Sequence, residues 1–290
     1  MKKSKIKGLI LLLIIYVIAT FAGIGIYLLL KPYLHPLLCV LIADVVATIA
    51  VWLTGIPLKT ASVYDPYWSV QPIVIGILLM IDFGAYNLGT FLYLGALAFW
   101  AIRLTFNFCI EFTNLNYIDW RYASYKAKYP KIYQLINLFG FCMMPTLLVY
   151  ATSLPVFVYI INGYDFNFLN IIGLSIMVIA TFLELFADVQ MKKFRRERKS
   201  RSELNRIGLW KYSRHPNYLG EISFWYGVAA VAFIGNFSSW YLPIGAILNT
   251  LLFVFISIPL AENSMKSYKD GFEEYKRETR MLLPIPRFKK

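Results

Sequence analysis

Charged side chains are scarce in this 290-residue chain, and acidic ones are the scarcest. Charged residues make up 16% of the sequence and hydrophobic residues 59%, with a mean hydropathy of +0.58. A soluble domain is about one quarter charged, and a water-soluble core of this length cannot hide so much apolar surface. The composition therefore excludes an ordinary soluble protein and predicts an integral membrane protein.

Metal ligands and glycine-rich nucleotide motifs are also lacking. The chain has two histidines and three cysteines, with no CxxC pair, so the ligand spacing of a zinc site is missing and we expect no metal. No GxGxxG stretch occurs. If a dinucleotide binds, helix ends and arginines must hold it in place of a glycine-rich loop.

The net charge of +13 comes from cations placed between apolar runs. This pattern is the usual topology signal of membrane proteins and gives no reason to expect a nucleic-acid partner. With a cytoplasmic N-terminus, the cations fall on cytoplasmic segments, apart from Lys31 outside and Arg103 within a span. We therefore expect the polar clusters described below to face the cytoplasm.

Apolar runs divide the chain into about eight segments that resemble membrane spans. The first follows four lysines and lacks a cleavage pattern, so we expect a retained span and not a removed signal peptide. Asp44, in the second run, has no evident partner and is assigned a structural role. The expected fold is an all-α integral membrane protein, a bundle of about eight transmembrane helices with a polar C-terminal helix. We expect spans at about 6–30, 37–56, 72–85, 90–110, 135–161, 168–190, 217–234 and 241–260.

Two polar clusters fall in the first half of the chain. The loop 57–71 carries Tyr64, Asp65 and Gln71, and it is either an aromatic belt at the membrane surface or a substrate pocket. Asp65 and Gln71 are not aromatic, so an aromatic belt does not account for them. Arg103 lies in an apolar run, four residues before Asn107. A guanidinium there either snorkels to the interface or meets an acid, an anion or water, and the second case marks a functional residue.

The sixth run ends in a polar stripe within ELFADVQMKKFRRE. Glu184, Asp188 and Arg195 share one helix face if the helix continues past the bilayer. Such a stripe is either an ion-pair ladder or a face toward a ligand that carries hydroxyls and phosphate.

The stretch GLWKYSRHPNYLGE, residues 208–221, opens the seventh run. Pro216 suits the first turn of a helix, whose free N–H groups favour an anion. A basic juxtamembrane segment explains Arg214 but not Asn217 and Glu221 on one helix face. The candidate residues of this stretch are Arg214, His215, Asn217, Tyr218 and Glu221.

A family resemblance rests on DPYWSVQP, WAIRLTFN, DWRY, ELFADVQMKKFRRE, GLWKYSRHPNYLGEISFWYG and KSYKDGFEEYKRETRMLLPIP. These stretches resemble the membrane-embedded steroid 5-alpha-reductase superfamily, most closely its DUF1295-type bacterial branch, related to sterol delta-14 reductases and isoprenylcysteine carboxyl methyltransferases. The resemblance implies an NADPH-dependent oxidoreductase that reduces a carbon–carbon double bond of a lipid, such as a steroid-like or isoprenoid enone. No internal repeat or low-complexity linker interrupts the chain, so we expect one structural domain, with an N-terminal transmembrane helix pair at 1–60 and a reductase-like transmembrane domain at 61–290.

The resemblance assigns roles to individual positions. Asp188, Arg195, Asn217, Glu221 and Tyr275 match cofactor-holding residues, whereas Trp100 stands in place of the catalytic tyrosine. We expect the lipid substrate to enter from the bilayer and a donor from loop 57–71 to stabilise the developing oxyanion. The expected cofactor residues are Glu184, Asp188, Lys192, Arg195, Arg214, His215, Asn217, Tyr218, Glu221 and Tyr275, and the expected catalytic residues are Tyr64, Asp65, Gln71 and Arg103.

Two alternatives stay open. An S-adenosylmethionine-dependent lipid or isoprenylcysteine methyltransferase shares an RHPxYxG element, but such enzymes tend to show paired glutamates where this chain has the single Glu262. The second alternative is a catalytically degenerate protein that binds lipid and NADPH, and Trp100 favours it.

Overall fold

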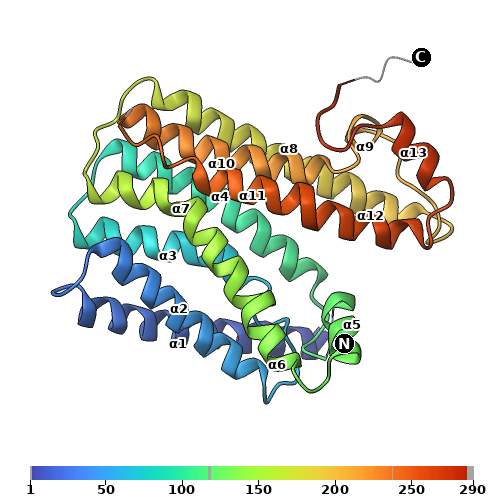
Figure 1. The fold of residues 1–290 in the computed structure, drawn as a ribbon, viewed down its shortest axis with the longest axis horizontal. Coiled ribbons are helices and arrows are strands. Elements are labelled where there is room, and N and C mark those ends of the chain that lie inside the picture. The colour runs from blue at the N-terminus through green and yellow to red at the C-terminus, as the bar shows by residue number, and fades with distance from the viewer. Residues whose placement is uncertain (1, 117–118, 237, 286–290) are drawn as a thin grey trace. The chain divides into compact units, whose positions relative to one another are not determined.

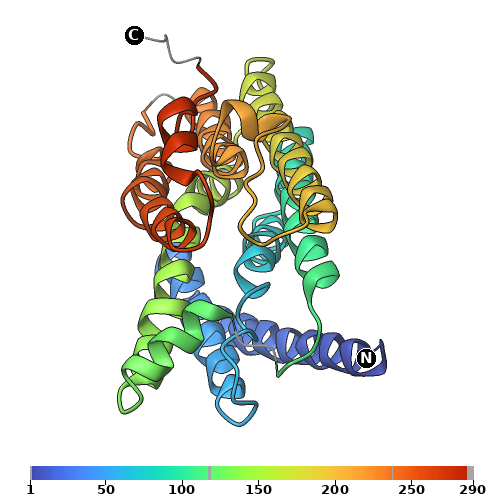
Figure 2. The ribbon, with the colours of Figure 1, turned by 90° about the vertical axis from the view of Figure 1, so that its right-hand side faces the viewer.

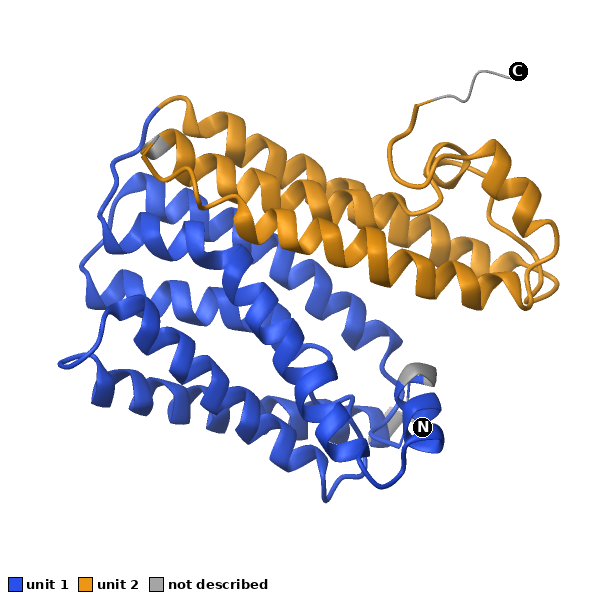
Figure 3. Cartoon of the chain, in the orientation of Figure 1, with its two compact units in different colours: residues 1–167 blue, residues 168–290 orange. Residues whose placement is uncertain are grey.

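The computed structural model describes residues 2–116, 119–236 and 238–285, and across these residues the chain is helical with no strand (Figure 1). The chain divides into two compact units, residues 1–167 and 168–290 (Figure 3). Pro286, in the closing sequence motif, lies outside the described residues.

Unit 1 contains the first four long helices and a bent fifth. The helices α1 and α2 pack along one another, and both α2 and α3 pack on α7. Tyr16 of α1 also donates a hydrogen bond to the carbonyl oxygen of Val63 at 2.7 Å. The first two helices therefore belong to the same core as the later ones. The elements are α1 (Lys2–Leu30), α2 (Pro36–Gly55), α3 (Tyr67–Asp82), α4 (Leu88–Glu111), α5 (Trp120–Lys128), α6 (Tyr133–Ile136), η1 (Asn137–Met143) and α7 (Met144–Ile161).

The start of α3 differs from the sequence expectation. We expected a loop up to Gln71 and a helix from Pro72, but the helix begins at Tyr67 and runs through this proline. Pro72 is the sixth residue of this helix, so it removes the backbone donor that would pair with the carbonyl oxygen of Trp68. Because the helix begins at Tyr67, Gln71 lies one helical turn after Tyr67, on the same face.

Unit 2 is built around two helices, α8 and α10, that pack along much of their length (Figure 1). The helix α8 continues without interruption to Glu197, so the condition for one polar stripe is met. Pro216 is the first residue of α10, as its sequence position predicts. The elements are α8 (Asn170–Glu197), α9 (Leu209–Tyr212), α10 (Pro216–Gly235), α11 (Ile244–Leu252), η2 (Phe253–Ser257), α12 (Ile258–Lys266) and α13 (Phe272–Glu278).

Glycines allow the close approach of α8 and α10. A Cβ atom on Gly173 would lie 2.7 Å from the backbone nitrogen of Val231, and one on Gly227 would lie 2.9 Å from that of Met177. The side-chain amide of Asn170 adds a 2.8 Å hydrogen bond to the carbonyl oxygen of Val231. These contacts fix how the two polar faces of unit 2 meet.

Six helical segments among the described residues are long and apolar enough to cross a membrane, at 4–30, 36–55, 88–111, 133–161, 170–197 and 244–266. The helix α3 is apolar but shorter, at 16 residues, and α10 is not among the six. The protein is thus a multi-pass integral membrane protein. The count of eight and the cytoplasmic N-terminus stay predictions.

Candidate functional site

The polar residues form one group in each unit. In unit 1, Tyr67 donates a hydrogen bond from its hydroxyl to Asp44 Oδ1 at 3.3 Å, and the Gln71 amide donates to the same hydroxyl. All three side chains are buried, with 4% of Asp44 and 2% of Tyr67 exposed. The Tyr67 hydroxyl is therefore the centre of a carboxyl–phenol–amide group, and it gives Asp44, for which the sequence showed no partner, a hydrogen-bond donor.

A small cavity borders this group between α1, α2 and α3. Its volume is about 20 Å³, and Asp44 and Gln71 face it together with Thr20 and apolar residues. A space of this size holds one water molecule or the polar end of a larger molecule. The arrangement offers hydrogen-bond donors and acceptors at the end of an otherwise apolar space.

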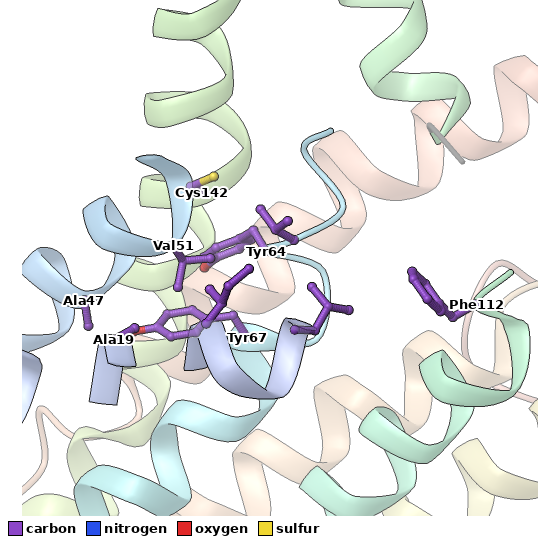
Figure 4. Packing of buried hydrophobic residues seen from close by; sticks show 10 residues of the cluster. Ala19, Ala47, Val51, Tyr64, Tyr67, Phe112 and Cys142 are labelled. Carbon is purple, nitrogen blue, oxygen red and sulfur yellow. The ribbon is translucent and has the colours of Figure 1, made fainter. Parts of the chain in front are cut away.

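Tyr64 lies beside Tyr67 in the buried apolar cluster of unit 1, with ring centroids 5.6 Å apart (Figure 4). Its hydroxyl shares a 2.7 Å hydrogen bond with Thr146, which shares one of 2.8 Å with Thr48. Burial raises the pKa of Tyr64 well above its ordinary value. The structure thus places two buried phenols side by side. Tyr67 is hydrogen-bonded to a carboxyl group, and Tyr64 is hydrogen-bonded to the first of two linked threonine hydroxyls.

Asp65 and Arg103 have different surroundings. Asp65 is half-buried and accepts a 2.5 Å hydrogen bond from the hydroxyl of Tyr122, so it acts as an acceptor. Arg103 is buried on α4 with 7% of its surface exposed. Trp100, one turn before it, is fully buried and packs edge-on against Trp68 at 5.8 Å. The indole of Trp100 therefore fills the core of unit 1.

The stripe on α8 changes from buried to exposed along the helix. Glu184 is 2% exposed and packs on Gly220 of α10, where an added Cβ would come within 2.4 Å of the glutamate side chain. Asp188 and Lys192 are half-buried, and Arg195 is exposed. The face therefore runs from a buried acid to an exposed cation.

Arg214 and His215 meet a buried acid that the sequence assigned to no cofactor role. Arg214 Nε donates to Glu262 Oε1 at 2.8 Å, and His215 Nε2 lies 3.1 Å from the same oxygen. Lys276 reaches the other carboxylate oxygen at 3.3 Å. Arg214 also donates to the carbonyl oxygens of Lys276 and Thr279. This network ties the start of α10 to α12 and α13, and a phosphate role for Arg214 stays a prediction.

The remaining residues of the seventh-run motif lie along α10. His215 stacks on Tyr218 with ring centroids 5.2 Å apart and planes 10° apart, and Tyr218 contacts Phe253 of η2. Glu221 is buried and accepts a 2.8 Å hydrogen bond from the indole of Trp225. Asn217 is half-buried at the first turn. The motif thus lines the helix start with aromatic rings and amide and carboxylate groups.

Tyr275 of α13 is buried and donates from its hydroxyl to the carbonyl oxygen of Trp210 at 2.5 Å. The Trp210 indole in turn donates to the carbonyl oxygen of Ala187 at 3.1 Å. Burial raises the pKa of Tyr275 above its ordinary value. The segment that holds α13 lies beside the α9 segment in two views (Figures 1 and 2), so Tyr275 connects the tail to the stripe helix α8 through Trp210.

Two partners were missed at the sequence level. Asp44 and Glu262 organise their respective groups, yet the hydrogen-bond partners lie 23 residues away for Asp44 and 48 away for Glu262. The signal for each was its position alone, because a lone carboxyl group in an apolar run requires a partner. Among the described residues, no cluster of three or more histidine, cysteine or acidic side chains could hold a metal ion.

The helices and polar groups define a multi-pass helical membrane protein with a buried polar group in each unit. Residues 24–279 match the family described as "Protein of unknown function (DUF1295)", and the chain belongs to this family. It is similar to "Uncharacterized protein C594.04c" of Schizosaccharomyces pombe, with 25% identity over 215 residues, which cover 65% of this chain and 61% of that relative. The chain therefore matches less than two thirds of the relative's length. No solved structure matches the chain significantly.

Proposed function

We propose that this protein is an NADPH-dependent reductase of a polarised carbon–carbon double bond in a lipid, within the superfamily that its motifs resemble. The observation that carries the proposal is the Asp44–Tyr67–Gln71 group. A carboxyl group inside an apolar helix is costly and marks a functional site by default. The carboxyl group of Asp44 accepts a hydrogen bond from a phenol and borders a cavity with mostly apolar walls. Such a polar group beside an apolar space suits the polar end of a lipid.

Tyr67 is the proton donor in this proposal. Hydride addition to the beta carbon of an enone moves the double-bond electrons onto the carbonyl oxygen, which then requires a hydrogen-bond donor and a proton. The Tyr67 hydroxyl, which donates to Asp44 in the structure, turns to this oxygen and gives it its proton. Asp44 enters the step protonated and returns a proton to Tyr67, and water then reprotonates Asp44. When bound, NADPH supplies the hydride and leaves as NADP+, so the lipid gains one hydride and one proton.

The donors that the sequence indicates keep distinct roles in this scheme. Tyr64 provides a second hydroxyl, held by Thr146. Asp65 is occupied as an acceptor for Tyr122, which favours a positioning role over proton donation. Arg103 contributes positive charge on α4, and Gln71 orients the Tyr67 hydroxyl.

The groups of unit 2 fit a ligand with hydroxyls at one end and phosphates at the other. The buried carboxylates Glu184 and Glu221 accept hydrogen bonds from hydroxyl and amide donors. Lys192 and Arg195 stand at the more exposed end of α8, where an anion arrives from water. We therefore assign the phosphates to this end of the stripe.

One observation favours the methyltransferase alternative. Glu262 neutralises Arg214 and lies against His215, so the Arg-His pair offers less positive charge than its sequence indicates. S-adenosylmethionine carries no phosphate and would not require that charge. The two cofactors must therefore be compared directly.

Cofactor binding is tested by thermal unfolding of the purified full-length protein. At about 100 times its dissociation constant, NADPH should stabilise the fold by about 2.7 kcal/mol. Asp188→Ala and Arg195→Ala should lose this shift, whereas Lys193→Ala should keep it, because Lys193 pairs with Glu197 on an exposed face of α8. A shift with S-adenosylmethionine and none with NADPH would replace the reductase by the methyltransferase.

The donor is tested by NADPH oxidation with a panel of unsaturated lipid ketones. Tyr67→Phe should slow oxidation by about 10²- to 10⁴-fold and keep the NADPH-induced shift. Tyr16→Phe is the matched control, because the ring centroid of Tyr16 lies 5.6 Å from that of Tyr67 but its hydroxyl donates to a backbone carbonyl oxygen. Equal losses in both variants would show a structural role. Binding without oxidation across the panel would support the degenerate lipid-binding protein.

A further inference from the structure

The connector after α8 and the turn after α12 are held together by hydrogen bonds. The backbone N–H of Asp270 donates to the carbonyl oxygen of Ser202 at 3.0 Å, and the Lys269 ammonium donates to that of Glu203. Both helices belong to segments long and apolar enough to cross a membrane. These bonds therefore join the segments that follow two candidate spans, and we infer that the joined segments lie at a membrane surface.

Four cations gather at this junction, namely Arg195, Arg198, Arg201 and Lys269. We assign Arg195 to the NADPH phosphates above and consider the other three here. Burial lowers the pKa of Lys269, and the positive fields of Arg198, Arg195 and Arg201 lower it further, against the opposing field of Glu203. In the part of the chain that the structure describes, no ion pair joins Arg198 or Arg201 to an acidic side chain. The folded chain thus holds like charges close together.

The nearby acid orders the loop. Glu203 Oε1 accepts hydrogen bonds from the backbone N–H groups of Lys199 and Ser200, each at 2.9 Å. The N–H of Ser202 donates to the Ser200 hydroxyl at 3.1 Å. The carboxylate is used to fix the backbone of the connector, and the loop presents its cations in a defined place.

Exposed apolar side chains occur in the same two segments as the cations. Tyr268 and Ile207 expose 48% and 65% of their surfaces, and the Lys269 ammonium lies 5.5 Å from the centre of the Tyr268 ring. Cations beside exposed aromatic and aliphatic groups are typical of chain segments at the membrane surface. Anionic lipid headgroups attract such basic juxtamembrane segments.

We propose that Arg198, Arg201 and Lys269 form a binding site for the phosphate group of an anionic phospholipid. A phosphodiester brings acceptor oxygens between the three cations and removes their mutual repulsion. Its acyl chains extend along the apolar surfaces of the neighbouring spans. The site is independent of the proposed reductase activity, because the lipid bound here is a constituent of the membrane and is not converted.

Lipid binding is measured on the full-length protein in nanodiscs of phosphatidylcholine, with and without phosphatidylglycerol. Phosphatidylglycerol should raise the melting temperature of the wild type, and native mass spectrometry should detect the bound lipid. Arg201→Gln and Lys269→Gln should each weaken binding about fivefold, which corresponds to about 1 kcal/mol per charge. Lys193→Gln removes one charge from α8 outside the cluster and should change binding by less than twofold.

Arg201 is exposed, so its variant should fold even if the Lys269 variant does not. Equal stability of the wild type in both nanodiscs, or equal losses in the Lys193 and Arg201 variants, would overturn the proposal. A third arm adds NADPH or inorganic pyrophosphate in phosphatidylcholine alone. If these soluble phosphates stabilise the protein through Arg201 and phosphatidylglycerol does not, the cluster binds a soluble phosphate and the lipid assignment is wrong.

Discussion

Gly173 and Gly227 determine how closely α8 and α10 pack, and replacing either one by alanine should separate the helices. A Cβ on Gly173 would approach backbone nitrogen and side-chain atoms of Val231 to 2.7 Å, whereas ordinary contacts of such atoms lie at 3.4–4 Å. Backbone atoms cannot rotate away, so the helices must move apart by roughly 0.7 Å. Overpacking of this kind costs about 3 kcal/mol at the upper end of its usual range.

The gain in helix propensity opposes this cost. Alanine in place of glycine favours a helix by about 1 kcal/mol, so Gly173→Ala should destabilise the protein by about 2 kcal/mol net. The melting temperature in detergent should then fall by roughly 4–8 °C. Gly95→Ala on α4 is the control, because nothing lies within 4 Å of its added Cβ; this variant should be neutral or slightly more stable.

A double variant sharpens the test. The carbonyl oxygen of Gly227 lies 2.9 Å from the Cβ position of Gly173, and that of Gly173 lies 3.0 Å from the Cβ position of Gly227. Once one alanine has separated the helices, the second should cost less, so the two losses should not add. Full additivity, or a Gly173 variant as stable as the Gly95 variant, would refute the packing argument.

Three further predictions concern the polar groups. Glu262→Gln leaves Arg214 without its buried counter-charge and should destabilise the fold by about 3–5 kcal/mol in thermal unfolding. This loss of stability is larger than the loss from neutralising one acid of an exposed ion pair. Burial and Arg198 lower the pKa of Lys269 in the folded protein, so the unfolded chain binds the ammonium proton more tightly. The free energy of unfolding should therefore rise as the pH increases toward about 10.5. In denaturation curves, Lys269→Gln should flatten that rise. Thr146→Val removes the hydroxyl partner of the buried Tyr64 and should cost about 1–3 kcal/mol of stability, a loss that Tyr64→Phe in the same chain should largely cancel.

The sequence predicted the helices well because each long apolar run has to form internal hydrogen bonds in lipid. The start of α10 at Pro216 and the continuation of α8 past Arg195 are confirmed for the same reason, since local rules decide them. The start of α3 was wrong because we treated Pro72 as a boundary. The helix begins five residues before this proline and runs through it, although the ring removes one intrahelical hydrogen bond.

Long-range polar pairing could not be predicted from local patterns. Asp44 acquires its partner Tyr67 only because α2 and α3 meet in unit 1, and Arg214 meets Glu262 only because α12 passes the start of α10. Nothing in the spacing of these residues indicates such contacts. The sequence identified the polar stretches but not which of their members are bound to one another.

The π-helical segment η2, Phe253–Ser257, has a consequence for the direction of α12. A π turn accommodates one residue more than an α-helical turn, so η2 sets the rotation of every residue that follows it. If the same residues formed regular α-helix instead, the extra residue would turn α12 by about 100° about its axis. Glu262 would then face away from Arg214 and His215. The angular position of this carboxylate therefore depends on the π conformation of the preceding turns.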